Sequence, residues 1–249
     1  MKEPEVNWRN FIKACEYAKQ NGVTTAMFTG KGEPTLFPNQ ITKYLQIMQP
    51  YNFPFIEMQT NALKFAKYEK KRDEYREHLV AWYKLGLTLT AISVVHYDSE
   101  KNRQIYTPYR KEYPDLSDTI SFIHDVGRGQ AGLKGLSIRL TCILAKGYID
   151  SVEEVKRLVS FAKANKVEQL TLTPVNKPDE DHSRNEEAWQ WTNVHGLSEE
   201  EVNTISYYVV KNGSVLMELP HGAKVFDLDG QNVCLNRCLT VDPDPERMR

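Results

Sequence analysis

The chain has 249 residues, of which 41% are apolar, and its formal net charge is −1. This length suffices for one large α/β domain or two small ones with a sizeable core, and no apolar run approaches the roughly 18 residues of a membrane-spanning helix. The near-zero charge argues against a protein that binds nucleic acids or other polyanions over a large surface, so we expect no clear nucleic-acid binding.

The predicted elements alternate between helices and strands. Apolar residues at helical spacing predict helices over residues 7–21, 39–49, 118–126, 151–165 and 198–211, and the last two begin with capping-box patterns. Short β-prone runs predict strands over residues 24–29, 55–60, 87–95, 136–144 and 169–173. The charge-rich residues 64–84 are expected to form a helix with a solvated face, and residues 99–118 and 176–197 to be irregular. Residues 215–219 predict an extra strand, and residues 224–233 a hairpin that turns at Asp229-Gly230.

The cysteines and the first residues indicate the cellular compartment. Residues 1–4 carry no apolar segment that resembles a signal peptide. Cys15, Cys142, Cys234 and Cys238 are too few and too scattered for a disulfide framework. Cys234 and Cys238 have C-x3-C spacing without a third cysteine nearby. We take them as structural or incidental, and the alternative is an auxiliary site in a longer protein. We therefore expect a soluble cytoplasmic protein without membrane contacts.

A glycine turn follows the first predicted strand. It reads Thr29-Gly30-Lys31-Gly32-Glu33-Pro34. The two glycines allow a tight turn and a close approach of the backbone to a ligand. Glu33 is therefore a carboxylate held just beyond the carboxyl end of a strand, which is where α/β proteins bind ligands.

Other strands also end in polar residues. The pair Thr60-Asn61 follows the second strand, Ser93 and His96 lie at the end of the third, and Thr173-Pro174 ends the fifth. Five strands that are each followed by a helical segment predict parallel β/α units with right-handed crossovers. This pattern indicates a full or partial barrel with its site on the carboxyl face of the strands.

At this point the sequence resembles the radical S-adenosylmethionine (radical SAM) superfamily. Residues 29–36 look like the Gly-Gly-Glu-Pro motif of that family, with a lysine between the glycines. The resemblance implies that Glu33 pairs with the ammonium group of SAM, and that Gly30, Lys31 and Gly32 contact it through backbone groups.

Later residues match further family positions, in the family's order. Thr60 and Asn61 stand where the family often places a polar pair near SAM. Ser93 matches the ribose and carboxylate contacts, and Arg139 matches a position that can face the methionyl carboxylate. Thr173-Pro174-Val175 matches a segment that lies along the adenine.

One part of the family pattern is absent. The family has a C-x3-C-x2-C loop after its first strand, and the three thiolates bind a [4Fe–4S] cluster. This chain opens on what resembles the helix after that loop. The resemblance therefore implies a partial (β/α)6 TIM-like barrel with its first strand missing over residues 1–197, and a C-terminal helix and hairpin extension over residues 198–249. We expect a truncated sequence or a misassigned start rather than the decay of a pseudoenzyme.

Three functions stay open from the sequence. The first is a radical SAM enzyme, or a piece of one, which would use SAM, a [4Fe–4S] cluster and an electron donor such as a flavodoxin or ferredoxin to abstract hydrogen from an unknown substrate. This chain alone is expected to be inactive, because its cysteines do not supply the three thiolates. The second is a degenerate barrel that binds SAM or a partner without catalysis. The third, an aldolase-like barrel enzyme, would need a lysine inside a strand, and none is well placed.

Overall fold

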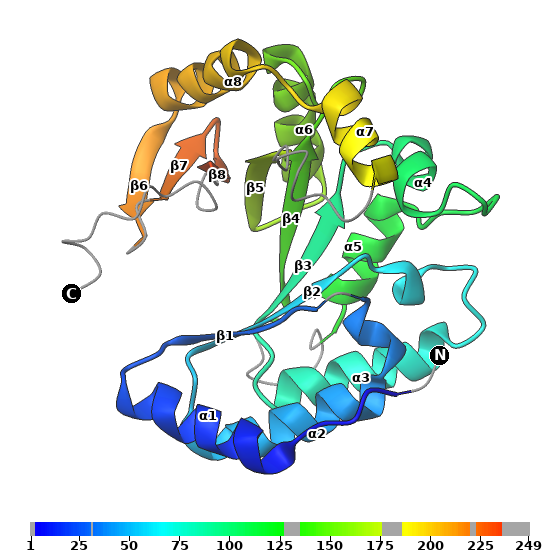
Figure 1. Ribbon diagram of the computed structural model, residues 1–249, viewed down its shortest axis with the longest axis vertical. Helices are drawn as coiled ribbons and strands as arrows, with labels where there is room; N and C mark the ends of the chain where they lie inside the picture. Colours follow the sequence, from blue (N-terminus) through cyan, green and yellow to red (C-terminus); the bar gives the residue numbers. More distant parts are fainter. Residues whose placement is uncertain (1–2, 31, 127–134, 176–185, 220–222, 236–249) are drawn as a thin grey trace. The chain divides into compact units, whose positions relative to one another are not determined.

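The computed structural model describes residues 3–30, 32–126, 135–175, 186–219 and 223–235 (Figure 1). The chain divides into two compact units. Unit 1 contains residues 1–93 and 111–138, and unit 2 contains residues 94–110 and 139–249.

Unit 1 is built on three parallel strands in the order β1 (Thr25–Phe28), β2 (Phe55–Thr60) and β3 (Leu89–Val94). Its helices are α1 (Trp8–Gln20), α2 (Pro38–Met48), α3 (Arg72–Lys84) and α5 (Leu116–His124), with short 3-10 turns at Pro34–Leu36, Gln49–Tyr51 and Leu63–Phe65. Helices α1, α2 and α3 lie along one face of β1 and β2 (Figure 1).

The core of unit 1 lies between this helix-covered face and the helices. Phe28 points to this side, because its ring meets that of Tyr44 on α2 at 5.7 Å. Leu45 and Met58 are completely buried. Trp82 is also completely buried, and its indole Nε1 donates to Thr42 Oγ1 at 2.9 Å, so the polar atom of this large side chain keeps a partner.

Unit 2 contains strands in the order β4 (Ser137–Leu144, of which residues 139–144 belong to this unit), β5 (Gln169–Pro174), β8 (Gln231–Leu235), β7 (Lys224–Leu228) and β6 (Ser214–Glu218). The first three strands are parallel, and the last three form an antiparallel meander. Its helices are α4 (Ser99–Tyr106), α6 (Val152–Ala164), α7 (Glu186–His195) and α8 (Glu199–Asn212).

Hydrogen bonds at helix starts explain several boundaries. The capping box predicted at Ser198 and Glu201 is confirmed, since each side chain bonds the backbone of the other residue. At Ser151 only half of the predicted box forms: its hydroxyl accepts from Glu154 N, while the Glu154 carboxylate bonds Tyr97 and Arg157. A competing tertiary contact therefore replaces the local one.

The predicted hairpin is confirmed as β7 and β8, with positive φ angles of 53° at Asp229 and 77° at Gly230 in its turn. These angles suit an Asp-Gly pair in a two-residue hairpin turn. Strand β8 also pairs in parallel with β5, which joins the hairpin to the unit 2 sheet. The sequence did not predict this pairing.

Three sequence predictions were wrong in part. Residues 99–106 form helix α4 instead of an irregular segment, because the Asp98 side chain caps it by accepting from Glu100 N. Residues 186–195 form helix α7, while residues 176–185 lie outside the described ranges. The helix expected over residues 64–84 begins only at Arg72, whose Nε donates to Phe65 O and whose Nη2 pairs with Asp118.

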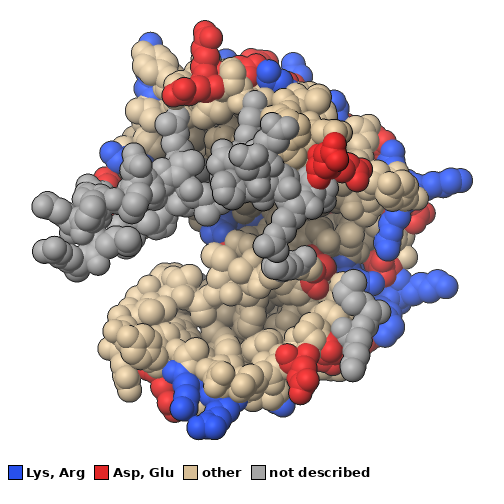
Figure 2. Space-filling view, viewed as in Figure 1, with Lys and Arg blue, Asp and Glu red and all other residues tan. Residues whose placement is uncertain are grey.

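The fold class, a mixed α/β protein, is confirmed. Within the described ranges, none of the helices combines the length and the apolar character needed to cross a membrane. On the face shown in Figure 2, basic and acidic side chains are interspersed over the described residues.

We predict that Leu45→Ala lowers the free energy of unfolding by ~2–5 kcal/mol. The Leu45 side chain is completely buried, and its removal leaves a cavity in the core. Urea denaturation measures this change. The matched control is Ile12→Ala on α1, whose side chain is 37% exposed, and its cost is expected to be below about 1 kcal/mol. Equal losses for the two variants would contradict the position of the core.

Candidate functional site

The turn after β1 holds Glu33 by hydrogen bonds from two parts of the chain. Its Oε1 accepts from Thr35 N at 3.0 Å, Thr35 Oγ1 at 2.6 Å and Thr60 Oγ1 at 2.7 Å. Its Oε2 accepts from Asn61 N at 2.8 Å. The carboxylate thus ties the turn to the carboxyl end of β2, and it joins three of the residues that the sequence singled out.

In this arrangement Glu33 can accept one further hydrogen bond. The four partners are neutral, so they keep the negative charge in place without cancelling it. A carboxylate oxygen has two acceptor sites, and Oε2 uses one of them among the described residues. Glu33 can therefore accept from a cationic group that approaches on its Oε2 side.

The glycines of the turn have open space above them. Apart from its chain neighbours, a Cβ atom added to Gly30 or Gly32 would meet nothing within 4 Å among the described residues, and neither residue is among those with a positive φ. Neither the backbone conformation nor internal packing therefore requires glycine at these two positions. The close approach of a ligand to the backbone would still explain why these positions are glycine. Lys31, between them, lies outside the described residues.

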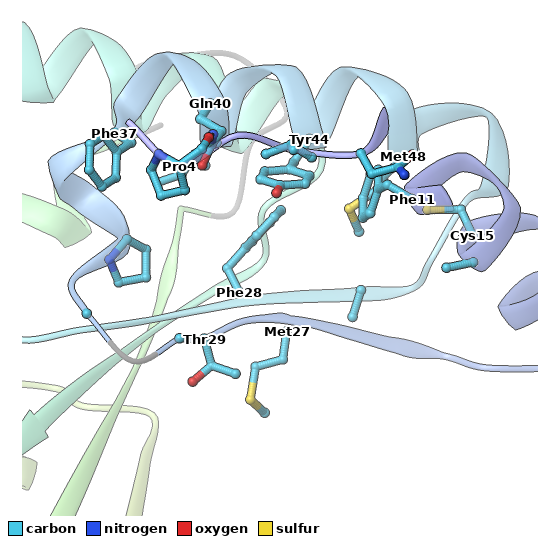
Figure 3. A pocket seen from close by; sticks show the side chains of 18 of the residues that line it. Pro4, Phe11, Cys15, Met27, Phe28, Thr29, Phe37, Gln40, Tyr44 and Met48 are labelled. Carbon is cyan, nitrogen blue, oxygen red and sulfur yellow. The ribbon is translucent and has the colours of Figure 1, made fainter. Parts of the chain in front are cut away.

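A pocket of about 1070 Å³ begins at this turn and runs between α1, β1 and α2. Figure 3 shows Phe28 pointing into it towards Tyr44, with Phe11, Cys15 and Met48 beyond, whereas Met27 points away from it. Among the residues that the structure describes, the charged ones in its lining are Glu5 and Glu33. The pocket thus offers an apolar interior with an acidic end, on the helix-covered side of β1.

Another polar pair lies on the opposite side of β1. Thr29 Oγ1 donates to Gln59 Oε1 at 2.9 Å, and Gln59 Nε2 contacts Met27 Sδ at 3.1 Å. By register, Gln59 pairs with Ala91 and so shares a face with Ser93, which is half-buried at the end of β3. Gln59 was not among the site residues expected from the sequence. The alternation of side chains along β2 could have identified it, because this alternation puts Gln59 on the face opposite to Thr60.

The remaining expected site residues lie in unit 2. Arg139 is half-buried on β4 and pairs with Gln169, Thr173 pairs with Ile143, and Pro174 pairs with Leu144. Val175 N donates to Leu144 O at 3.4 Å. The structure therefore joins these residues on β4 and β5, and separately joins the Glu33 group in unit 1.

His96 belongs to a hydrogen-bonded cluster in unit 2. Its Nδ1 accepts from Asp98 N at 2.9 Å, which leaves the proton on Nε2, 3.5 Å from Glu154 Oε2. Tyr97 donates to the same Glu154 oxygen at 2.9 Å. Burial lowers the pKa of His96, and the nearby carboxylates of Glu154 and Asp98 oppose that effect only in part. These contacts within the protein give His96 a structural role.

The described cysteines do not fit an iron–sulfur cluster. Cys15, Cys142 and Cys234 are buried in α1, β4 and β8. Burial raises the pKa of the Cys15 and Cys142 thiols, which disfavours the thiolate form that binds iron. Within the described ranges no three His, Cys, Asp or Glu side chains gather as metal ligands. Cys238 lies outside these ranges.

Several solved structures share the fold of this chain, and one of them is a radical SAM methyltransferase. At 16–18% identity this likeness concerns the fold alone. SuiB from Streptococcus suis bound to S-adenosylmethionine matches 98% of this chain and 47% of its own, with a TM-score of 0.58 and 16% identity. SuiB bound to the precursor peptide SuiA matches 85% of this chain and 41% of its own, with a TM-score of 0.54 and 18% identity.

A radical SAM methyltransferase from Sphaerobacter thermophilus also matches, over 80% of this chain and 52% of its own, with a TM-score of 0.53 and 16% identity. This chain thus spans about half the length of these proteins. No family model and no curated protein matches the sequence.

We predict that Glu33→Gln lowers the free energy of unfolding by ~1–3 kcal/mol, because the new amide group faces donors that need an acceptor. Urea denaturation without any ligand measures the loss. Glu5→Gln, an exposed change at the same pocket, is the control and should cost almost nothing. A stable Glu33→Gln protein would show that these bonds contribute little.

The lowered pKa of His96 predicts a pH dependence. In the unfolded chain its pKa is about 6.5, so below that pH the unfolded state binds more protons than the folded state and stability falls. The urea midpoint should therefore decrease from about pH 7.5 to about pH 5. His96→Asn, whose Oδ1 can accept from Asp98 N, should show a smaller decrease. Parallel pH profiles of the two proteins would refute this assignment.

Proposed function

We propose that this chain is a radical SAM enzyme, or part of one, that binds S-adenosylmethionine at the carboxyl ends of its strands. The observation that carries the proposal is the Glu33 carboxylate, which Thr35, Thr60 and Asn61 hold beside two glycines with open space. A fixed carboxylate with one acceptor site left suits a primary ammonium group, which has three donors to satisfy.

The other proposed contacts with SAM follow the resemblance. Gly30, Lys31 and Gly32 would contact the ammonium group through their backbone, with Thr60 and Asn61 orienting Glu33. Ser93 would contact the ribose and carboxylate, and Arg139 the methionyl carboxylate. The segment Thr173-Pro174-Val175 would lie along the adenine.

We further propose that the fold is a partial (β/α)6 barrel over residues 1–197 that lacks its first strand, followed by an extension over residues 198–249. Two observations support this. The outer edge of β1 pairs with no strand among the described residues. The apolar pocket between α1, β1 and α2 lies beside that edge, where the side chains of another strand would pack.

The chemistry implied by the resemblance is hydrogen abstraction from a substrate by a 5′-deoxyadenosyl radical made from SAM, with electrons from a cluster and a donor such as a flavodoxin or ferredoxin. The described cysteines do not fit that cluster. We therefore propose that this chain alone, in the cytoplasm, holds SAM without cleaving it. The substrate of the complete enzyme is not identified.

A non-catalytic SAM-binding or partner-binding barrel is the second candidate. The burial of Cys15, Cys142 and Cys234 at separate places favours it, because such thiols are typical of core packing. The enzyme and a SAM-binding barrel both predict SAM binding, whereas a barrel that binds only a partner does not. The first two differ in whether a separately supplied cluster-binding segment restores cleavage.

Binding is tested by calorimetric titration of SAM into the wild type and Gly32→Ala. Apart from its chain neighbours, a methyl group at Gly32 meets no described atom within 4 Å, so stability should not fall while SAM binding weakens by about tenfold, or ~1.4 kcal/mol. Tyr109→Ala, at a side chain 99% exposed, is the control and should bind like the wild type. Wild-type protein that binds no SAM would refute the proposal.

A second test measures 5′-deoxyadenosine after iron–sulfur reconstitution and addition of a reductant. We expect none from this chain, because its described cysteines do not gather. Production of 5′-deoxyadenosine would overturn the proposal that the chain alone is inactive.

A further inference from the structure

Two hydroxyl groups in unit 2 lack hydrogen-bond partners. The Oγ1 atoms of Thr141 and Thr173 are buried and make no hydrogen bond to any residue that the structure describes. More than nine in ten buried polar groups in native proteins are paired, and an unpaired one costs about 1–3 kcal/mol. Two such groups on neighbouring strands therefore need a physical explanation.

Both hydroxyls lie on the same face of β4 and β5. On β4 the residues Ile138, Leu140, Cys142 and Leu144 are buried, and Ser137, Arg139, Thr141 and Ile143 alternate with them and are half-buried. Thr173 pairs with Ile143, so its side chain points to the half-buried face and lies diagonally from Thr141.

The composition of this face indicates which ligand it suits. Its members on the two strands are Ser137, Arg139, Thr141, Ile143, Gln169, Thr171 and Thr173. They include a guanidinium, hydroxyls and an amide, and no carboxylate. A face with one positive charge and several neutral donors suits an anionic, acceptor-rich group.

We infer that Arg139, Thr141 and Thr173 form one subsite for a carboxylate group. Each threonine as a whole is half-buried, so a ligand can reach its side chain. A rotation about χ1 between staggered wells turns the hydroxyl towards that ligand. Arg139 supplies the charge, and the two hydroxyls donate to the same carboxylate once it is bound.

The carboxylate has two possible sources, and the chemistry is shared. One is the carboxylate at the amino-acid end of SAM, and this interpretation rests on the proposed function. The other is a carboxylate of the unidentified substrate, and this interpretation does not rest on it. In the first case Thr173 binds the methionyl end of SAM through its side chain, a role beyond the adenine contact that the resemblance implies.

The experiment records the methyl signals of ¹³C-threonine by NMR while probes are added to the chain. The probes are SAM, decarboxylated SAM, which keeps the ammonium but lacks the carboxylate, and sodium acetate against sodium chloride. Thr35 and Thr60 report on the Glu33 group in the same spectra. Single Thr→Val variants assign the signals.

Thr90 is the matched control. Its hydroxyl is also buried without a partner in the described chain, but Thr90 pairs with Met58 and so lies on the helix-covered face of unit 1. Thr90→Val and Thr141→Val should both leave the melting temperature equal to or above that of the wild type, because each removes an unpaired buried hydroxyl. Only Thr141→Val should weaken carboxylate binding, by about tenfold.

The outcomes separate the proposals. If SAM, but not decarboxylated SAM, shifts the signals of Thr141 and Thr173, the subsite binds the SAM carboxylate. If SAM shifts only the threonines around Glu33 and acetate shifts Thr141 and Thr173, SAM binding stands and the subsite serves the substrate. If acetate shifts them while SAM shifts nothing, the proposed function fails and the subsite stands. If neither SAM nor acetate moves Thr141 and Thr173, the inference is overturned.

Discussion

The carboxylate of Glu33 is the interaction on which the turn after β1 depends. A glycine-containing turn has little of its own to hold it, since glycine loses more backbone freedom on folding than other residues. Here hydrogen bonds from Thr35 on one side and from Thr60 and Asn61 on the other fix the carboxylate, and with it the turn, against the end of β2. The same group is then both a structural joint and the proposed ligand of an ammonium group.

This double role affects how a binding defect should be read. Any change at Glu33 disturbs the turn as well as its charge, so weaker binding by such a variant does not identify a ligand contact. Gly32 separates the two effects, because the space above it is open and its backbone angle is ordinary. The hydroxyls of Thr141 and Thr173 are the opposite case, because they are buried without a partner among the described residues. Their removal is expected to leave the stability of the unliganded protein unchanged and to weaken carboxylate binding.

The apolar pocket next to β1 bears on the fold more than on the ligand. Its lining is mostly apolar, and it opens beside a strand edge that pairs with no described strand. An unpaired edge with exposed Met27 and Val23 is a place where a protein usually adds a strand or a cover. A charged molecule such as SAM matches the polar groups around Glu33 better than this interior.

The sequence by itself determined the strands, the carboxyl-end turn at residues 29–36 and the Asp229-Gly230 hairpin, because these depend on short-range alternation and turn chemistry. It also identified Glu33, Thr60 and Asn61, which the structure joins. Only the tertiary structure decided where the Glu154 side chain bonds, that β8 pairs with β5, that Gln59 shares a face with Ser93, and that Thr141 and Thr173 lie unpaired on one face. These depend on strand register and on partners far apart in the chain, and no local pattern encodes which of several possible partners a polar group will find.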